Sequence, residues 1–101
     1  MTVTKKDMVR RIAFETEIRQ SEVKEVVQKF LVNMVETLSE GKKIEFRRFG
    51  TFELVVAKKT KGRNPKKPQN EVIIPEHVKV RFRPSQELKN KVLQLDTNDF
   101  K

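Results

Sequence analysis

Two stretches near the N-terminus place apolar residues at helical spacing. In the longer stretch, the intervals between apolar residues alternate between three and one, as on one face of a helix of about five turns. The residues of this stripe are Val23, Val26, Val27, Phe30, Leu31, Met34, Val35 and Leu38. We expect Ser21 to cap this helix and Gly41 to end it. A shorter helix before it is predicted to begin at Thr4 and Asp7, which have the spacing of a capping box, and to end near Thr16.

Beyond residue 43, apolar and polar residues alternate instead, which is the spacing of β-strands. We expect a first strand over residues 44–48, a turn or bulge at Gly50, and a second strand that starts at Phe52. A third strand is predicted over residues 72–82, with a bend at Pro75. Its last part alternates between apolar and basic side chains, which predicts one buried face and one cationic face. The alternating residues are Val78, Lys79, Val80, Arg81, Phe82 and Arg83.

A last, short helix is expected after Ser85, with Leu88, Val92 and Leu95 on its apolar face and a loose tail over residues 96–101. The order of these elements predicts an α+β fold. We expect the three helices to form a base and a three-stranded antiparallel sheet to extend into a long β-ribbon arm.

The chain of 101 residues is short enough for one domain, 1–101. We expect a dimerisation body over residues 1–56 and 76–95 and an arm over residues 57–75, with the tail last. A chain this short, with an arm that buries nothing, has little core, and small domains of this kind often need a partner.

The arm carries most of the unbalanced charge. Residues 58–68 contain six positive charges, no negative one, and no aliphatic or aromatic side chain. The net charge of the chain is +9, whereas residues 1–45 have nine basic and eight acidic side chains and are nearly neutral. A basic arm that leaves the body indicates a polyanionic partner, which we interpret as DNA; the alternative is a solvated charged segment. Pro65 at the tip offers an apolar wedge without a backbone N–H to satisfy.

The sequence gives little support to other classes of function. The absence of cysteine excludes disulfides and thiolate chemistry and fits a cytoplasmic protein. We see neither an apolar run long enough for a membrane span nor a signal peptide. His77 is the sole histidine and is interpreted as a surface residue at a strand bend. Without a glycine-rich phosphate loop or metal-ligand spacing, we expect no enzyme, no cofactor, no metal site and no small-molecule substrate.

Three short motifs carry a resemblance to a known family. They are RFGTFE at residues 48–53, GRNP at 62–65 and FRPSQELK at 82–89. Over nearly its whole length the chain resembles the HU and integration host factor family of bacterial DNA-bending, histone-like proteins. The resemblance implies an intertwined homodimer or heterodimer in the nucleoid. Its two arms would wrap the minor groove, Pro65 would insert between base pairs, and Arg63 and Asn64 would lie beside it.

The sequence and the resemblance together give a set of candidate site residues. Those expected to contact DNA are Arg47, Lys58, Lys59, Lys61, Arg63, Asn64, Pro65, Lys66, Lys67, Lys79, Arg81 and Arg83. By resemblance, Phe49, Phe52 and Phe82 form an aromatic dimer core. The chain departs from the family pattern between Pro65 and Pro75, where it has one residue more than is usual, and we expect Asn70 to occupy a turn there.

Phosphate contacts carry no sequence information, and the minor groove distinguishes mainly A·T from G·C pairs. We therefore expect weakly specific binding, with a preference for bent, nicked or flexible duplex. One alternative is a site-specific bender of the integration host factor type, in which Glu45 and Arg47 read the site instead of forming a cross-strand or surface ion pair. The other is a basic RNA-binding protein or RNA chaperone.

Overall fold

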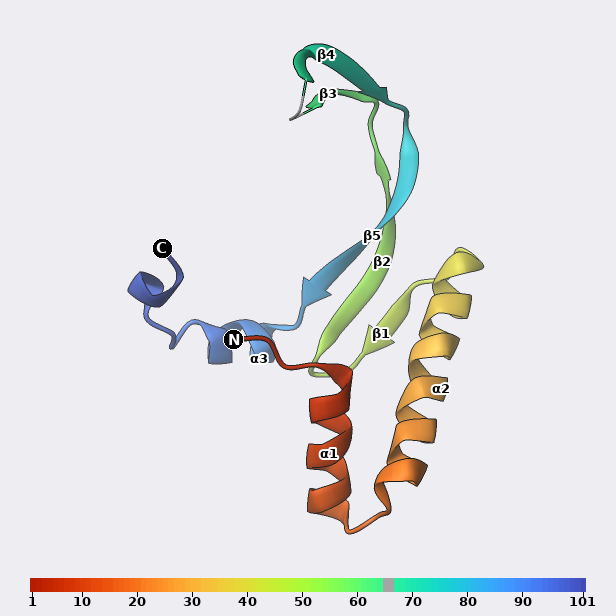
Figure 1. Cartoon of the computed structure of the whole chain (residues 1–101), viewed down its shortest axis with the longest axis vertical. Helices are drawn as coiled ribbons and strands as arrows, with labels where there is room; N and C mark the ends of the chain where they lie inside the picture. Colours follow the sequence, from red (N-terminus) through yellow and green to blue (C-terminus); the bar gives the residue numbers. More distant parts are fainter. Residues whose placement is uncertain (65–66) are drawn as a thin grey trace.

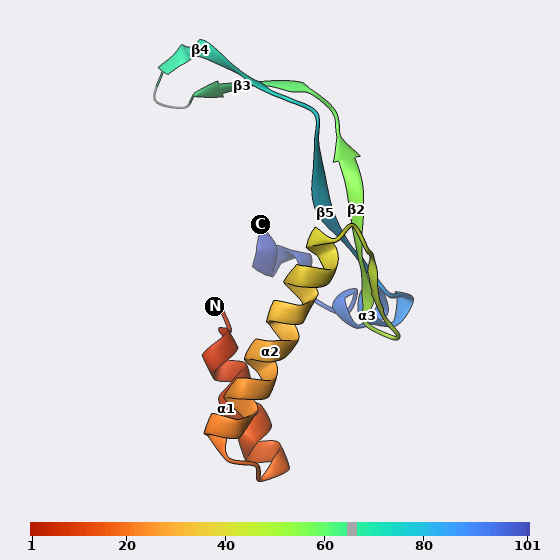
Figure 2. The ribbon, with the colours of Figure 1, turned by 90° about the vertical axis from the view of Figure 1, so that its right-hand side faces the viewer.

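The computed structural model describes residues 1–64 and 67–101, and the side chains of all of these outside residues 63–71. A helical hairpin stands at one end, a twisted sheet rises beside it, and a two-stranded arm curls away at the other end (Figures 1 and 2). The elements are α1 (Lys5–Thr16), α2 (Gln20–Ser39), β1 (Ile44–Phe46), β2 (Gly50–Ala57), β3 (Thr60–Asn64), β4 (Lys67–Ile74), β5 (His77–Pro84), α3 (Gln86–Val92) and the 3-10 helix η1 (Thr97–Phe100).

Helix α1 begins at the predicted capping box. The backbone N–H of Asp7 donates to Thr4 Oγ1 at 3.3 Å, and the backbone N–H of Thr4 donates to Asp7 Oδ2 at 3.0 Å. The hydrogen bonds that Thr4 donates to Asp7 Oδ2 from its backbone N–H and from its hydroxyl, helped by the charges of Arg10 and Lys6, lower the pKa of the Asp7 carboxyl. The predicted start of this helix, and its end at Thr16, are confirmed.

The predicted cap of α2 is wrong. The helix begins at Gln20 with Arg19 as its N-cap, no side chain caps it, and Ser21 lies inside its first turn. The cause is the short connection from α1. Glu17 adopts the left-handed conformation, with φ 60°, and the chain turns there, so that α2 begins before Ser21. Gly41 ends α2 as predicted, with φ +83° and its N–H donating to the carbonyl of Leu38 at 3.0 Å.

The body sheet has the strand order β1-β2-β5, and both strand pairs are antiparallel. The first strand ends at Phe46 and does not reach Arg48 as predicted. Residues 47–49 form a tight turn because Arg48 adopts φ 67° and the N–H of Phe49 donates to the carbonyl of Phe46 at 3.0 Å. Gly50 then opens β2 directly, two residues earlier than predicted.

The arm is a separate two-stranded sheet of β3 and β4. The structure breaks the strands at the predicted bend, residues 75–76, and also at residues 58–59, where a continuous strand was predicted. The two breaks let the arm turn away from the body (Figure 2). Pairing runs regularly from Thr60↔Ile74 to Arg63↔Glu71 and then shifts to Asn64↔Lys67. Asn70 therefore belongs to β4 and not to a turn, and the pairing of the arm is irregular between Arg63 and Asn64.

A single chain buries very little. Among the described residues only Val9 and Val23 are buried hydrophobic side chains, at 3% and 5% exposure. The radius of gyration is 18.7 Å, compared with about 13 Å for a compact domain of this size. The face of β5 that was predicted to be buried is open in the single chain, with Val78 64% exposed.

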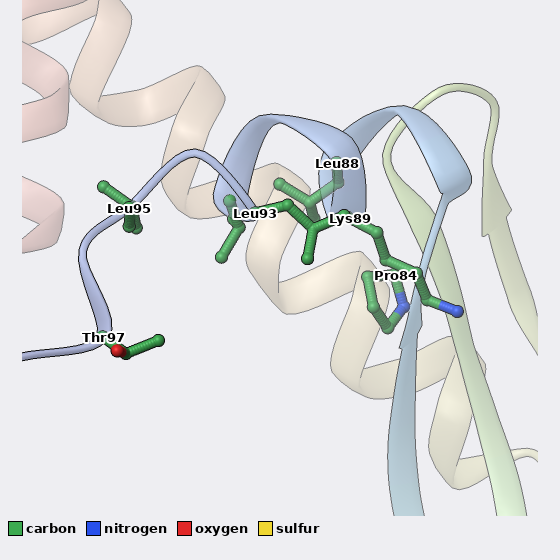
Figure 3. Close-up of a pocket in the computed structure, with 7 residues that line it drawn as sticks. Pro84, Leu88, Lys89, Leu93, Leu95 and Thr97 are labelled. Carbon is green, nitrogen blue, oxygen red and sulfur yellow. The ribbon is translucent and has the colours of Figure 1, made fainter.

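The C-terminal segment is more ordered than predicted. Ser85 caps α3 as expected, accepting from the N–H of Leu88 at 3.1 Å. The tail that was predicted to be loose contains η1, which Asp96 caps by accepting from the N–H of Asn98 at 2.9 Å. An apolar groove of about 490 Å³ lies between α3 and this tail (Figure 3). Its lining residues are Pro84, Leu88, Lys89, Val92, Leu93, Leu95 and Thr97.

Candidate nucleic-acid interface

The two faces of the body sheet differ in charge. In the antiparallel register, Thr51 pairs with Arg83, Glu53 with Arg81, and Val55 with Lys79. Side chains that face each other across the pair lie on the same side of the sheet. Lys79, Arg81 and Arg83 are thus brought together as predicted, and we call the face that they share with Glu53 the cationic face.

Glu53 is the residue of this face that the sequence analysis missed. Arg81 donates to Glu53 Oε1 from Nε at 2.7 Å and also from Nη2, while Arg83 Nη1 lies 3.6 Å from Glu53 Oε2. The Arg81 hydrogen bond, followed by the charges of Arg81, Arg83 and Lys43, lowers the pKa of the Glu53 carboxyl below its ordinary value. A strand pattern alone does not predict this contact, because it depends on which residues the register places opposite each other.

A second basic group lies at the turn between β1 and β2. Arg47, Arg48 and Arg83 line a shallow groove of about 270 Å³ together with Glu45. Arg48 Nε lies 3.7 Å from Glu87 Oε1, which ties the turn to the start of α3. Within the part of the chain that the structure describes, neither Glu45 nor Arg47 takes part in an ion pair, so the cross-strand or surface ion pair considered for them is not formed.

The arm residues follow the two strands of the second sheet. Lys58 and Lys59 lie at the break between β2 and β3, and Lys61 lies in β3. Arg63 and Asn64 end β3, and Lys67 begins β4, although the side chains of these three are not described. Pro65 and Lys66 lie outside the described residues.

The opposite face of the body sheet carries a cluster of phenylalanine rings. The ring centroids of Phe52 and Phe82 are 4.8 Å apart, and those of Phe49 and Phe82 are 5.3 Å apart. The structure adds Phe46 and Phe30 to the three predicted rings, with their centroids 5.5 Å apart. We call these five residues the phenylalanine cluster. It remains partly open, since Phe49 is 48% exposed in the single chain.

Other kinds of site are not seen in the described residues. Within residues 1–64 and 67–101, no group of three or more His, Cys, Asp or Glu side chains is placed to hold a metal ion. None of the described helices combines the length and the hydropathy that a membrane crossing requires. His77 is exposed, and its Nδ1 lies 2.9 Å from the carbonyl oxygen of Pro75, as suits a residue at the bend between β4 and β5.

Comparison with known proteins gives consistent matches. The family described as Bacterial DNA-binding protein matches residues 3–93. The probable DNA-binding protein HU of Chlamydia trachomatis is 36% identical over 88 residues, which cover 87% of this chain and 88% of the relative. Integration host factor subunit alpha of Xylella fastidiosa is 38% identical over 92 residues, which cover 91% of this chain and 92% of the relative.

A solved structure agrees with these sequence matches. The cocrystal structure of Anabaena HU with DNA superimposes with a TM-score of 0.81 at 26% identity, covering 92% of this chain and all of that one. The match thus extends over most of the chain. The chain belongs to the bacterial DNA-binding protein family, the family of architectural proteins that includes HU and the integration host factor subunits.

Proposed function

We propose that this protein binds duplex DNA through its arm and its cationic face and bends it. The observation that carries the proposal is that Lys79, Arg81 and Arg83 share one face of the sheet from which the basic arm extends (Figure 1). Phosphates that follow the cationic face would be led onto the arm. Such contacts supply affinity and salt dependence without sequence specificity.

Pro65 is proposed to be the wedge. It lies in the sequence between Asn64, where β3 ends, and Lys67, where β4 begins. An apolar wedge unstacks a base step at a cost of a few kcal/mol and is compensated by the additional duplex that the bend brings against the protein. Smooth bending of a short site costs on the order of 1–6 kcal/mol, so bent, nicked or flexible duplex is expected to bind better. Arg63, Asn64 and Lys66 would contact the minor groove beside it.

The functional unit is proposed to be a dimer. The phenylalanine cluster and the apolar stripe of α2 stay partly exposed in one chain, with Phe82 38% and Val26 69% exposed. A second copy, or a related chain, would cover both. The body over residues 1–56 and 76–95 would form this base, with Phe49 and Phe52 at its centre, and the arm over residues 57–75 would remain outside it.

Weak sequence specificity and a nucleoid location in the bacterial cytoplasm complete the proposal, with no enzymatic activity. A site-specific role is the second candidate, since Glu45 and Arg47 line a groove next to Arg83 without pairing to each other. A competition assay separates the two: one genomic sequence that survives a large excess of random duplex would favour site-specific reading.

The proposal is tested by energy transfer between dyes at the two ends of a random duplex of about 30 base pairs, a length over which bending has a defined cost. Wild type should raise the transfer, and Pro65→Ala should bind but raise it much less. Pro68→Ala, which removes a proline inside β4, is the matched control and should bend the duplex as wild type does. If all three bind without bending, the arm only clamps the duplex; tighter binding to an RNA duplex of the same sequence would favour the RNA-binding alternative.

A further inference from the structure

We infer that Glu53 competes with DNA phosphate for Arg81 and Arg83: its carboxylate holds both arginines in the unbound protein and must release them when a duplex lies on the cationic face. This inference rests on the proposed function. It assigns to Glu53 a role that limits DNA affinity and reduces its dependence on salt.

The geometry fits a carboxylate that occupies the place of a phosphate. Arg81 uses both Nε and Nη2 on Glu53 Oε1, and Arg83 approaches the other oxygen, Oε2, at 3.6 Å. Two guanidinium groups that converge on two oxygens of one anion form the arrangement that arginines also make with phosphate. Glu53 therefore satisfies locally the donors that a DNA backbone would use.

The exposure of the three side chains allows a phosphate to replace Glu53 as the partner of the arginines. The Glu53 side chain is only 18% exposed, whereas those of Arg81 and Arg83 are 54% and 66% exposed. The carboxylate is thus largely shielded from solvent, whereas the two arginines that contact it are largely exposed. A phosphate can approach the guanidinium groups from outside and draw them away from Glu53 without any change in the backbone pairing of β2 and β5.

The charges determine the direction of the effect. One negative charge at Glu53 offsets part of the positive charge of Arg81 and Arg83, and after displacement it lies close to the bound phosphate. Both effects oppose binding. The charge of Lys43 also lowers the pKa of this carboxyl. It would still balance part of the negative charge of Glu53 after the arginines have moved to the phosphate. A support role, in which Glu53 only holds the arginines in position for DNA, would have the opposite sign.

The test compares Glu53→Gln with wild type in duplex binding over a series of salt concentrations. Glutamine keeps the size of the side chain and an acceptor oxygen but removes the charge. We expect affinity at low salt to rise about two- to fivefold, as for the loss of a surface ion pair. The plot of log affinity against log salt should steepen by up to about 0.9, since one further cation becomes available to the phosphates.

Glu15→Gln is the matched control, because it removes the same charge and breaks the 3.1 Å ion pair with Arg11 on α1, away from the sheet. It should leave both the affinity and the slope nearly unchanged. The gain from Glu53→Gln should also disappear when Arg81 and Arg83 are both replaced by Gln. Thermal unfolding of each variant shows whether it is folded.

A second readout follows the carboxyl itself. Nuclear magnetic resonance titration of Glu53 in the unbound protein and in the duplex complex should show its pKa rising on binding, as Arg81 and Arg83 leave it. Weaker binding by Glu53→Gln, an equal gain in Glu15→Gln, or a Glu53 pKa that does not move on binding would each overturn the inference. If wild type fails to bind duplex at all, the proposed function fails too; if wild type binds and Glu53→Gln matches it, only the role of Glu53 is refuted.

Discussion

Gly50 lies against the ring of Phe82, whose Cε1 and Cζ atoms are 2.6 Å from the position that a Cβ atom on residue 50 would occupy. The carbonyl oxygen of Arg83 is equally close to that position. A backbone oxygen in a paired strand has little freedom to move away. Residue 50 must therefore be glycine for β2 to start directly beside β5 and for Phe82 to join the phenylalanine cluster.

Gly50→Ala should destabilise the fold by about 1–3 kcal/mol, the usual cost of overpacking a close contact. Gly62→Ala is the control, because its Cβ would lie 3.5 Å from Ile74 Cδ1, an ordinary contact, and it should be close to neutral. Urea unfolding of both variants measures the difference. Equal stabilities would mean that the sheet accommodates a side chain at residue 50 by shifting.

Phe82→Ala should cost about 3–5 kcal/mol, as for other buried aromatic rings, once a second chain covers the phenylalanine cluster. Its loss should also lower the midpoint of thermal unfolding more at low protein concentration than at high concentration. Phe14→Ala removes an 86% exposed ring on α1 and should stay within about 0.5 kcal/mol of wild type. The dimer proposal would be contradicted if the two variants were equally stable at every concentration.

Thr4→Ala removes the hydroxyl that accepts from the N–H of Asp7 at the start of α1. The loss of an N-cap side chain typically costs about 1 kcal/mol, and the free energy of unfolding should fall by that amount. Thr4→Ser keeps the hydroxyl and should therefore retain most of the wild-type free energy of unfolding. A cost that serine does not recover would mean that the methyl group of Thr4, and not the cap, stabilises the helix.

Stability should fall in acid partly through Glu53, whose pKa is lowered from an ordinary value of 4.5, mainly by the Arg81 hydrogen bond. A carboxyl with a lowered folded-state pKa binds protons more weakly when folded. Its contribution is therefore complete above the unfolded-state pKa and is lost as the pH falls through the folded-state value. Urea unfolding below about pH 4.5 should show a shallower pH dependence for Glu53→Gln than for wild type. Parallel curves would exclude a Glu53 contribution.

Lys79→Ala should weaken binding to every duplex sequence by a similar factor and reduce the salt slope by about 0.9, the value for one phosphate contact. Lys79 lies on the cationic face opposite Val55. Arg11→Ala changes the net charge equally but lies on α1, and it should leave the slope unchanged. A smaller slope in both variants would indicate that total charge, and not the cationic face, controls affinity.

The parts of the fold that the sequence predicted are those set by local chemistry. The apolar stripe of α2, the caps at Thr4 and Ser85, and the stop at Gly41 each follow from neighbours within a few residues. The wrong prediction of Ser21 as a cap also came from local chemistry. Serine is a suitable cap residue, but the chain turns at Glu17 and α2 begins before Ser21.

The parts that were missed depend on contacts between distant residues. Glu53 meets Arg81 only because β2 and β5 pair in one particular register, and a shift by one residue would place them on opposite faces. The left-handed conformation of Arg48 is equally invisible in a strand pattern that continues through it. Phe30 joins the phenylalanine cluster from α2, which no strand alternation predicts.

The scarcity of buried side chains has a consequence for the abundance of the protein in the cell. A chain whose buried core is Val9 and Val23, among the residues described, should depend on association for stability, so its folded fraction should rise with its own concentration. Copies in excess of available partners present open apolar surface to proteases. Degradation would then remove unpaired chains first, and the amount of folded protein would be matched to the supply of partners without a dedicated regulator.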